Sequence, residues 1–287
     1  MYKFYKKKFK KNLRLFFIPL LFLVLIFFII SIIDYYKLDK DVRFCDDTKV
    51  FRDICLQNKA RNFVLTDEDK AWKLCYYISD SDSKNECYKS IILDLSKSDI
   101  NKGVIWCGKI PSEKWRGECF FNLALDYVDI NFDKATEMCE KSEIYRVFCY
   151  HDVVGAISKI SSKDALNICS RQADNLTRKS CFHGIGVHLG RFDESKTIEI
   201  CRGISEEFSK ESCYHGLGWS LSETDLQKAL NICQGFELPH KDKCLVGISW
   251  QIARTDEEKA KEICYLTGLL KEECLDYLNR EKNVKSD

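Results

Sequence analysis

Glycine and proline are scarce in this sequence, with 13 and 3 residues respectively among 287. That scarcity argues against a loop-rich or all-β chain and favours helix. Hydrophobic residues make up 45% and charged residues 31% of the chain, so it can build a core and keep a solvated surface. The length suits either one elongated domain or two compact ones.

A basic cluster is missing from everything after residue 14. Residues 1–14 hold seven lysines and arginines and no acidic residue, which leaves 38 basic against 44 acidic residues in the rest of the chain. Because neutralisation of phosphates dominates affinity for nucleic acids, we expect no nucleic-acid partner.

Recognisable catalytic constellations are also missing. No nucleophile–base set or carboxylate pair stands out, and no C-x2-C pair offers a familiar zinc spacing. We therefore expect no enzyme, no cofactor and no metal site, and a hydrolase acting on envelope polymers is the least favoured function. The glycines from Gly184 to Gly190 superficially resemble a phosphate loop, but they lie in a predicted helix rather than after a strand. Close contact between helices is the expected reason for them.

One long apolar segment covers residues 15–33, which read LFFIPLLFLVLIFFIISII and carry no charge. As a helix this segment spans roughly 28 Å, the thickness of a bilayer core. Basic residues precede it and Asp34, Asp39 and Asp41 follow it, so the positive-inside rule places the tail 1–14 in the cytosol and the rest outside. A small-x-small cleavage site is missing, which favours an uncleaved signal anchor over a signal peptide. A short stalk over 34–44 follows.

Sixteen cysteines, all after the apolar segment, are spaced regularly. A gap of 20 residues, which occurs seven times, alternates with gaps of 10 to 12 residues. A period of 30–32 residues carried through eight cysteine pairs marks a repeat array. The array covers 45–278, and a polar tail over 279–287 follows it.

Each period contains two helical patterns. The nine residues that end at the first cysteine of a pair, such as DEDKAWKLC at Cys75, open with Asp, Asn or Ser and carry a small residue four positions before the cysteine. The opening residue suits an N-cap, and the small residue shares a helix face with the cysteine. After the second cysteine comes a longer stretch in which apolar residues follow a 3.6-residue period, as over 119–128. The sequence predicts a pair of helices per repeat.

Two disulfide schemes fit this repeat. Pairing across the 20-residue gap leaves Cys45 and Cys274 unpaired, whereas pairing across the short gap uses every cysteine. We favour the short gap, because a cysteine ending one helix and one starting the next lie at the same end of an antiparallel pair, where Cα atoms approach about 5.5 Å. The favoured bridges are Cys45–Cys55, Cys75–Cys87, Cys107–Cys119, Cys139–Cys149, Cys169–Cys181, Cys201–Cys213, Cys233–Cys244 and Cys264–Cys274. Such bridges imply an oxidising compartment.

In repeat length, helix-pair pattern and cysteine pairing, residues 45 to about 278 resemble the tetratricopeptide and Sel-like α/α-repeat superfamily. They are most similar to its cysteine-rich, disulfide-stapled bacterial members, although the W-x2-L-G-x2-Y signature is missing. The resemblance implies an all-α fold, a right-handed α/α solenoid of about seven to eight repeats with one disulfide each. It also implies a binding surface for peptides or proteins, and it carries no catalytic residue.

Three histidines share one repeat position, two residues after the second cysteine: His151, His183 and His215. Stacked repeats would present them as a row, beside Trp219 and Trp250, which share a position four residues further on. These five residues form the candidate binding face, and a packing position is the alternative interpretation. Adjacent helices lie about 9–10 Å apart, so we expect the histidines to be too far apart to share a metal ion.

A glycosylation sequon starts at Asn175, in the loop expected between Cys169 and Cys181. Taken together, the patterns predict a single-pass membrane protein whose extracytoplasmic repeat array is a scaffold for a protein or peptide partner. The alternative is a metal or cofactor carrier that uses the row of histidines.

Overall fold

The computed structural model describes residues 21, 24–26, 28–29 and 40–284. The predicted basic tail, most of the apolar segment 15–33 and residues 34–39 of the predicted stalk lie outside this description. Among the described residues, no helix combines the length and the apolar character that a bilayer crossing requires.

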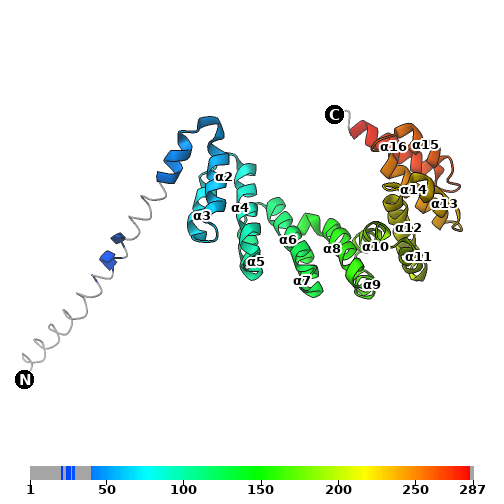
Figure 1. Cartoon of the computed structure of the whole chain (residues 1–287), viewed down its shortest axis with the longest axis horizontal. Helices are drawn as coiled ribbons and strands as arrows, with labels where there is room; N and C mark the ends of the chain where they lie inside the picture. Colours follow the sequence, from blue (N-terminus) through cyan, green and yellow to red (C-terminus); the bar gives the residue numbers. More distant parts are fainter. Residues whose placement is uncertain (1–20, 22–23, 27, 30–39, 285–287) are drawn as a thin grey trace, which may run out of the picture. The chain divides into compact units, whose positions relative to one another are not determined.

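The described chain is all-helical, without a strand over residues 40–284 (Figure 1). It divides into two compact units, one ending at Lys102 and the other beginning at Gly103. After a helical segment at 40–46, the first unit contains η1 (Lys49–Phe51), α2 (Arg52–Phe63), α3 (Glu68–Tyr76), α4 (Ser81–Ser96) and the start of α5 (Ile100–Cys107).

The second unit continues the same alternation of helices (Figure 1). It contains α6 (Glu113–Tyr127), α7 (Phe132–Lys141), η2 (Glu143–Tyr145), α8 (Arg146–Ile160), α9 (Ser162–Ser170), α10 (Asn175–Gly190), α11 (Glu194–Gly203), α12 (Glu207–Ser222), α13 (Leu226–Gln234), α14 (His240–Ile252), α15 (Glu257–Cys264) and α16 (Lys271–Val284). Because α16 continues to Val284, most of the predicted polar tail from 279 onward is helical.

The predicted helix pairs are confirmed. The odd-numbered helices from α3 to α15, here called the short helices, end at or near the first cysteine of a pair. The even-numbered helices from α4 to α16, here called the long helices, carry the second cysteine. The short helices have 8 to 10 residues, which is marginal for an isolated helix. Their stability must therefore come from packing and from the bridges.

The N-caps of the short helices are those that the repeat motif predicts. In each case the capping side chain accepts a hydrogen bond from the backbone N–H three residues later, which satisfies one of the free donors of the first turn. The capping residues are Asp67, Asp99, Asn131, Ser161, Asp193, Asp225 and Asp256.

All eight short-gap disulfides form, and no cysteine is free. The Cα atoms of bridged cysteines lie between 5.3 and 5.7 Å apart, as the antiparallel arrangement requires. Fifteen of the sixteen cysteines are fully buried, and Cys55 is half-buried. In the seven pairs that begin with Cys75, the small residue four positions before the first cysteine is also buried, for example Ala71 and Ala165. Seven bridges join a short helix, at or near its end, to the following long helix, and Cys45–Cys55 joins the helical segment at 40–46 to α2.

Glycines bring consecutive long helices of the second unit into close contact. A Cβ atom on Gly184 would lie 2.0 Å from the carbonyl oxygen of His151, and a Cβ on Gly216 would lie 2.3 Å from that of His183. A Cβ on Gly247 would lie 2.0 Å from the carbonyl oxygen of His215. All three glycines come three residues after the second cysteine of their repeat, so backbone meets backbone at the same point of each contact.

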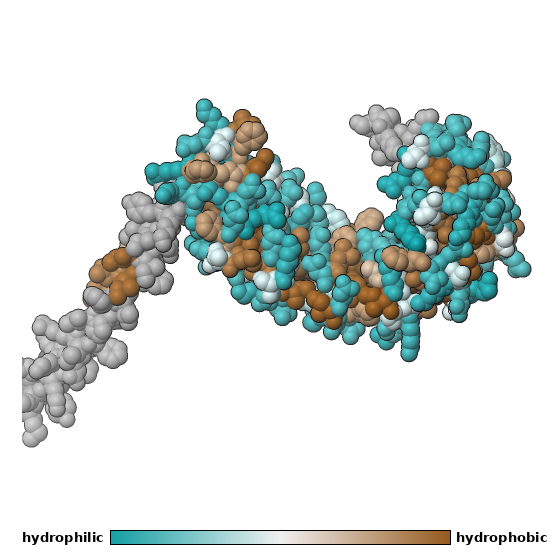
Figure 2. Space-filling view, viewed as in Figure 1, coloured by the Kyte–Doolittle hydropathy of each residue, from teal (hydrophilic) through white to brown (hydrophobic). Residues whose placement is uncertain are grey.

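The visible surface of the helix pairs is mostly hydrophilic, with apolar side chains exposed between the polar ones (Figure 2). Among the exposed apolar residues of the second unit are Ile130, Ile160, Phe192 and Leu269. Exposed apolar residues are a normal part of a folded protein's surface, and Ile130 and Ile160 line the same surface pocket.

Replacing one contact glycine tests the close packing. A Cβ on Gly186 would lie 2.2 Å from the carbonyl oxygen of Cys213, so we expect Gly186→Ala to lower the free energy of unfolding by about 2–3 kcal/mol. Gly203 has nothing within 4 Å of such a Cβ, and Gly203→Ala should leave stability unchanged or raise it by up to about 1 kcal/mol. Chemical denaturation with the disulfides intact measures both, and equal stabilities would contradict the packing.

Candidate functional site

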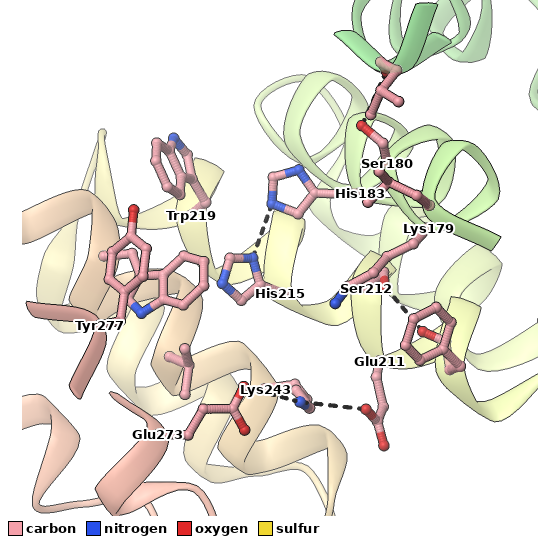
Figure 3. Close-up of a pocket in the computed structure, with 15 residues that line it drawn as sticks. Lys179, Ser180, His183, Glu211, Ser212, His215, Trp219, Lys243, Glu273 and Tyr277 are labelled. Carbon is pink, nitrogen blue, oxygen red and sulfur yellow. Dashed lines mark hydrogen bonds and ion pairs between the residues drawn. The ribbon is translucent and has the colours of Figure 1, made fainter. Parts of the chain in front are cut away.

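A pocket of about 350 Å³ lies on the long helices of the second unit (Figure 3). Five of these helices, α8, α10, α12, α14 and α16, supply all of its lining side chains. Four of the five residues predicted for the binding face line it: His183, His215, Trp219 and Trp250. His151, the fifth, lies outside the lining.

Aromatic rings form much of the pocket wall. The ring of Trp250 stacks on Tyr277 with the centroids 3.6 Å apart, and it meets the ring of His215 edge-on at 4.7 Å. Trp219 meets His183 edge-on at 6.2 Å. These stacked and edge-on contacts are the arrangements that aromatic rings prefer, and they pack the rings against one another along the wall.

Two lysines and two glutamates add charge to the pocket. The ammonium of Lys243 lies 3.5 Å from Glu211 and 3.9 Å from Glu273. The ammonium of Lys179 lies over the ring of Phe208, 4.9 Å from its centroid, and has no carboxylate partner in the described part of the chain. Lys179 is therefore the charge most available to a ligand.

The sequence prediction missed the lysines, the glutamates and Tyr277. Each of them falls within three positions of the second cysteine of its repeat. Their position relative to that cysteine was thus the signal that could have identified them, although the residue type at the position differs from one repeat to the next.

The row of histidines is continuous, contrary to what helix spacing predicted. Nε2 of His151 lies 2.9 Å from Nδ1 of His183, and Nε2 of His183 lies 2.9 Å from Nδ1 of His215. The separation that the usual helix spacing predicts is wrong for these rings, because the glycine contacts bring the helices closer than that spacing. Adjacent rings are therefore joined by hydrogen bonds. That the three histidines do not share one metal ion stays a prediction.

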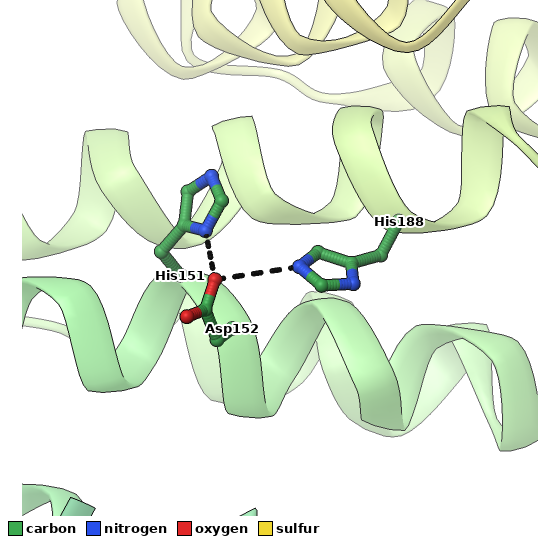
Figure 4. A group of neighbouring side chains, drawn as sticks. All are labelled: His151, Asp152 and His188. Carbon is green, nitrogen blue, oxygen red and sulfur yellow. Dashed lines mark hydrogen bonds and ion pairs between the residues drawn. The ribbon is translucent and has the colours of Figure 1, made fainter. Parts of the chain in front are cut away.

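One end of the row is held by a carboxylate (Figure 4). Oδ1 of Asp152 lies 2.6 Å from Nδ1 of His151 and 3.4 Å from Nε2 of His188. Burial alone would raise the pKa of the Asp152 carboxyl, but the hydrogen bonds from the two histidines hold it well below its usual range. Asp152 is therefore an anion that accepts hydrogen bonds.

The other end of the row reaches the pocket. Nε2 of His215 and Nε1 of Trp250 are both buried, and neither has a hydrogen-bond partner among the described residues. A buried polar atom without a partner costs about 1–3 kcal/mol and is rare in native proteins. Both residues line the pocket, although the two atoms themselves have almost no exposed surface.

Burial also keeps two rings of the row, those of His183 and His215, neutral. It lowers the pKa of His183 well below its usual value, and the charge of neighbouring rings adds to the effect. Burial, together with the positive charges of Lys179 and Lys243, lowers the pKa of His215 to about 3. Each of these two neutral rings has one nitrogen that donates and one that accepts.

The predicted sequon does not lie in an open loop. Asn175 is exposed, but it is the first residue of α10. The side chain of Thr177 is fully buried and donates to the Asp174 carboxylate. A glycosylation enzyme would therefore have to open the first turn of this helix to reach the threonine.

No protein-family model, curated protein or solved structure matches this chain. The geometry establishes an array of helical hairpins with one disulfide each, and function must be inferred from the residues of the second unit.

The low pKa of His215 predicts acid sensitivity. Between pH 6.5 and about 3 the unfolded chain binds a proton at residue 215 that the folded chain does not bind. The free energy of unfolding should therefore fall as pH falls, by up to about 1.4 kcal/mol per pH unit from this group. His215→Gln should make the fall shallower between pH 6 and 4 in denaturation curves. The control is His240→Gln, at a histidine paired with Glu207. Its free energy of unfolding should still fall with pH nearly as steeply as that of the wild type. Equal pH dependence in the two variants would contradict the assignment of this fall to His215.

Proposed function

We propose that this chain is a membrane-anchored, extracytoplasmic scaffold whose second unit binds a peptide segment of a partner protein. The observation that carries the proposal is the pair of buried, unpartnered nitrogens, Nε2 of His215 and Nε1 of Trp250, in an aromatic-walled pocket. A ligand that hydrogen-bonds to both atoms would recover the free energy that their burial costs.

The size and lining of the pocket favour a peptide. A volume of about 350 Å³ lies in the usual range for ligand sites, and it holds one or two side chains rather than a folded domain. The rings of Trp219, Trp250 and Tyr277 suit an apolar or aromatic side chain, and the ammonium of Lys179 suits a carboxylate. The occupant is therefore a segment with an apolar residue beside an acidic one.

The architecture supports the same function. Arrays of helical hairpins commonly bind extended segments along the face formed by one helix of each repeat, and this pocket is built from five such helices. The likeness of the repeat array to tetratricopeptide and Sel-like repeats also favours that mode of binding.

The membrane location rests on different observations. Residues 15–33 are uncharged and follow seven basic residues, which is typical of an anchor with a cytosolic N-terminus. Eight disulfides with no free cysteine are characteristic of an oxidising compartment. Both features favour an array held outside the cytosol.

A metal or cofactor carrier that uses the whole row of histidines is less favoured. Within the row, Nε2 of each ring meets Nδ1 of the next at 2.9 Å. Those nitrogens satisfy one another, so the interior of the row has no free ligand atom for a metal.

Peptide selection on the full-length protein in detergent tests the pocket. Sequences selected on the wild type should bind Trp250→Phe at least about tenfold more weakly, or about 1.4 kcal/mol, because the indole donor is lost. The matched control is Trp115→Phe, in α6 and outside the pocket lining, which should bind as the wild type does. Equal binding by Trp250→Phe would count against this pocket.

Thiol labelling in intact cells tests the compartment. We expect a membrane-permeant maleimide, added before lysis, to modify none of the cysteines, and all sixteen to react after denaturation and reduction. Mass spectrometry counts the labels. Extensive labelling without reduction would place the array in a reducing compartment and remove the extracytoplasmic part of the proposal.

A further inference from the structure

We propose that His151, Asp152 and His188 form a binding site for a divalent transition-metal ion of the zinc class, and that metal binding reverses the direction of the hydrogen bonds in the histidine row. The metal site stands on its own geometry, whereas its effect on the pocket rests on the proposed peptide-binding function.

Three ligand atoms of the right kinds converge at this point (Figure 4). Each of His151, Asp152 and His188 offers one atom, and these atoms all lie within 4.8 Å of one another. Two neutral imidazoles and one carboxylate form a donor set that Zn²⁺ and similar ions prefer, and three protein ligands leave a position for water or a further ligand. All three residues are partly buried.

The fold holds the ligands from two helices. His151 and Asp152 lie on α8, and His188 lies near the end of α10. The ring of His188 fits against α8 at Gly155, where a Cβ atom would lie only 2.4 Å from Cδ2 of the ring. The glycine therefore makes room for the third ligand, and a larger residue there would displace it.

The first ligand, His151, also has a hydrogen-bond partner for its second ring nitrogen. Metal-bound histidines usually donate their second ring N–H to an acceptor, which fixes the tautomer and the ring orientation. Nε2 of His151 lies 2.9 Å from Nδ1 of His183. If a metal ion binds Nδ1 of His151, the proton of Nδ1 is released to water. Nε2 of His151 then takes over the proton that Nδ1 of His183 held and donates it to that atom.

That change passes along the row. His183 must then carry its proton on Nε2 and donate to Nδ1 of His215, 2.9 Å away. A neutral His215 ring that accepts at Nδ1 has passed its Nδ1 proton to Nε2 of His183 and takes up a proton from water at Nε2. The row therefore holds three protons in either direction. The buried Nε2 in the pocket is then a donor.

The opposite direction follows when Asp152 accepts the Nδ1–H of a neutral His151 ring, at 2.6 Å. Nε2 of His151 then accepts from His183, and Nε2 of His183 accepts from His215. Nε2 of His215 is left as an acceptor in the pocket. One metal ion therefore decides whether Nε2 of His215 donates or accepts. A donor there, in a pocket that Lys179 and Trp250 also line, favours a carboxylate ligand.

Zinc titration of the full-length protein in detergent tests the site. We expect one Zn²⁺ per chain by calorimetry and elemental analysis. Asp152→Asn and His188→Gln should each weaken binding at least about tenfold, while the matched control His240→Gln should bind as the wild type does. All cysteines are bridged, so thiols offer no competing site. Failure of the wild type to bind Zn²⁺, or equal binding by variants with unchanged thermal stability, would overturn the site.

The coupling has a separate readout. Nitrogen-15 spectra of histidine-labelled protein should show the proton of His215 moving from Nδ1 to Nε2 when Zn²⁺ is added. In His183→Phe, which interrupts the row, Zn²⁺ should still bind but the His215 spectrum should not change. If Zn²⁺ binds to the wild type and the proton of His215 stays on the same nitrogen, the coupling is overturned and the metal site still stands. Neither result depends on a peptide ligand.

Discussion

The contact on which the second unit depends is the approach of one helix backbone to the next at glycine. At Gly184, Gly216 and Gly247 a single added carbon would collide with a carbonyl oxygen of the preceding long helix. Because interiors are close-packed, these contacts set the separation of α8, α10, α12 and α14. Rings at one repeat position can then touch across helices, which the usual helix spacing would prevent.

Covalent and local interactions prepare the helices for that contact. Helices of 8 to 10 residues are marginal alone. Each short helix is started by a side-chain cap and tied at its end to the next helix by a buried disulfide. The bridges restrict the unfolded chain, and the caps satisfy backbone donors that would otherwise lack partners. The hairpins can therefore present an invariant geometry for stacking even though their surface residues vary.

The two candidate sites lie at opposite ends of one hydrogen-bonded row. Asp152 holds the end at His151, and His215, whose Nε2 is buried without a partner, lines the pocket at the other end. A neutral imidazole donates from one nitrogen and accepts at the other. The hydrogen bonds between the three rings must therefore all run in the same direction along the row. A chemical event at one end is thereby communicated without any movement of the helices.

The sequence by itself determined the hairpins, their caps and the pairing of all sixteen cysteines, because these depend on residues within about a dozen positions of one another. It also placed His183, His215, Trp219 and Trp250 on a common face, since a repeat preserves the position of each residue. Tertiary structure decided the rest. The sequence does not contain the distance between stacked helices, so it predicted separate histidines where the glycine contacts produce a connected row. The meeting of His188 with Asp152 and the inclusion of Lys179 and Tyr277 in the pocket depend on which side chain each repeat carries at its position and on how the long helices pack. Only the packing of one helix against another brings such residues together.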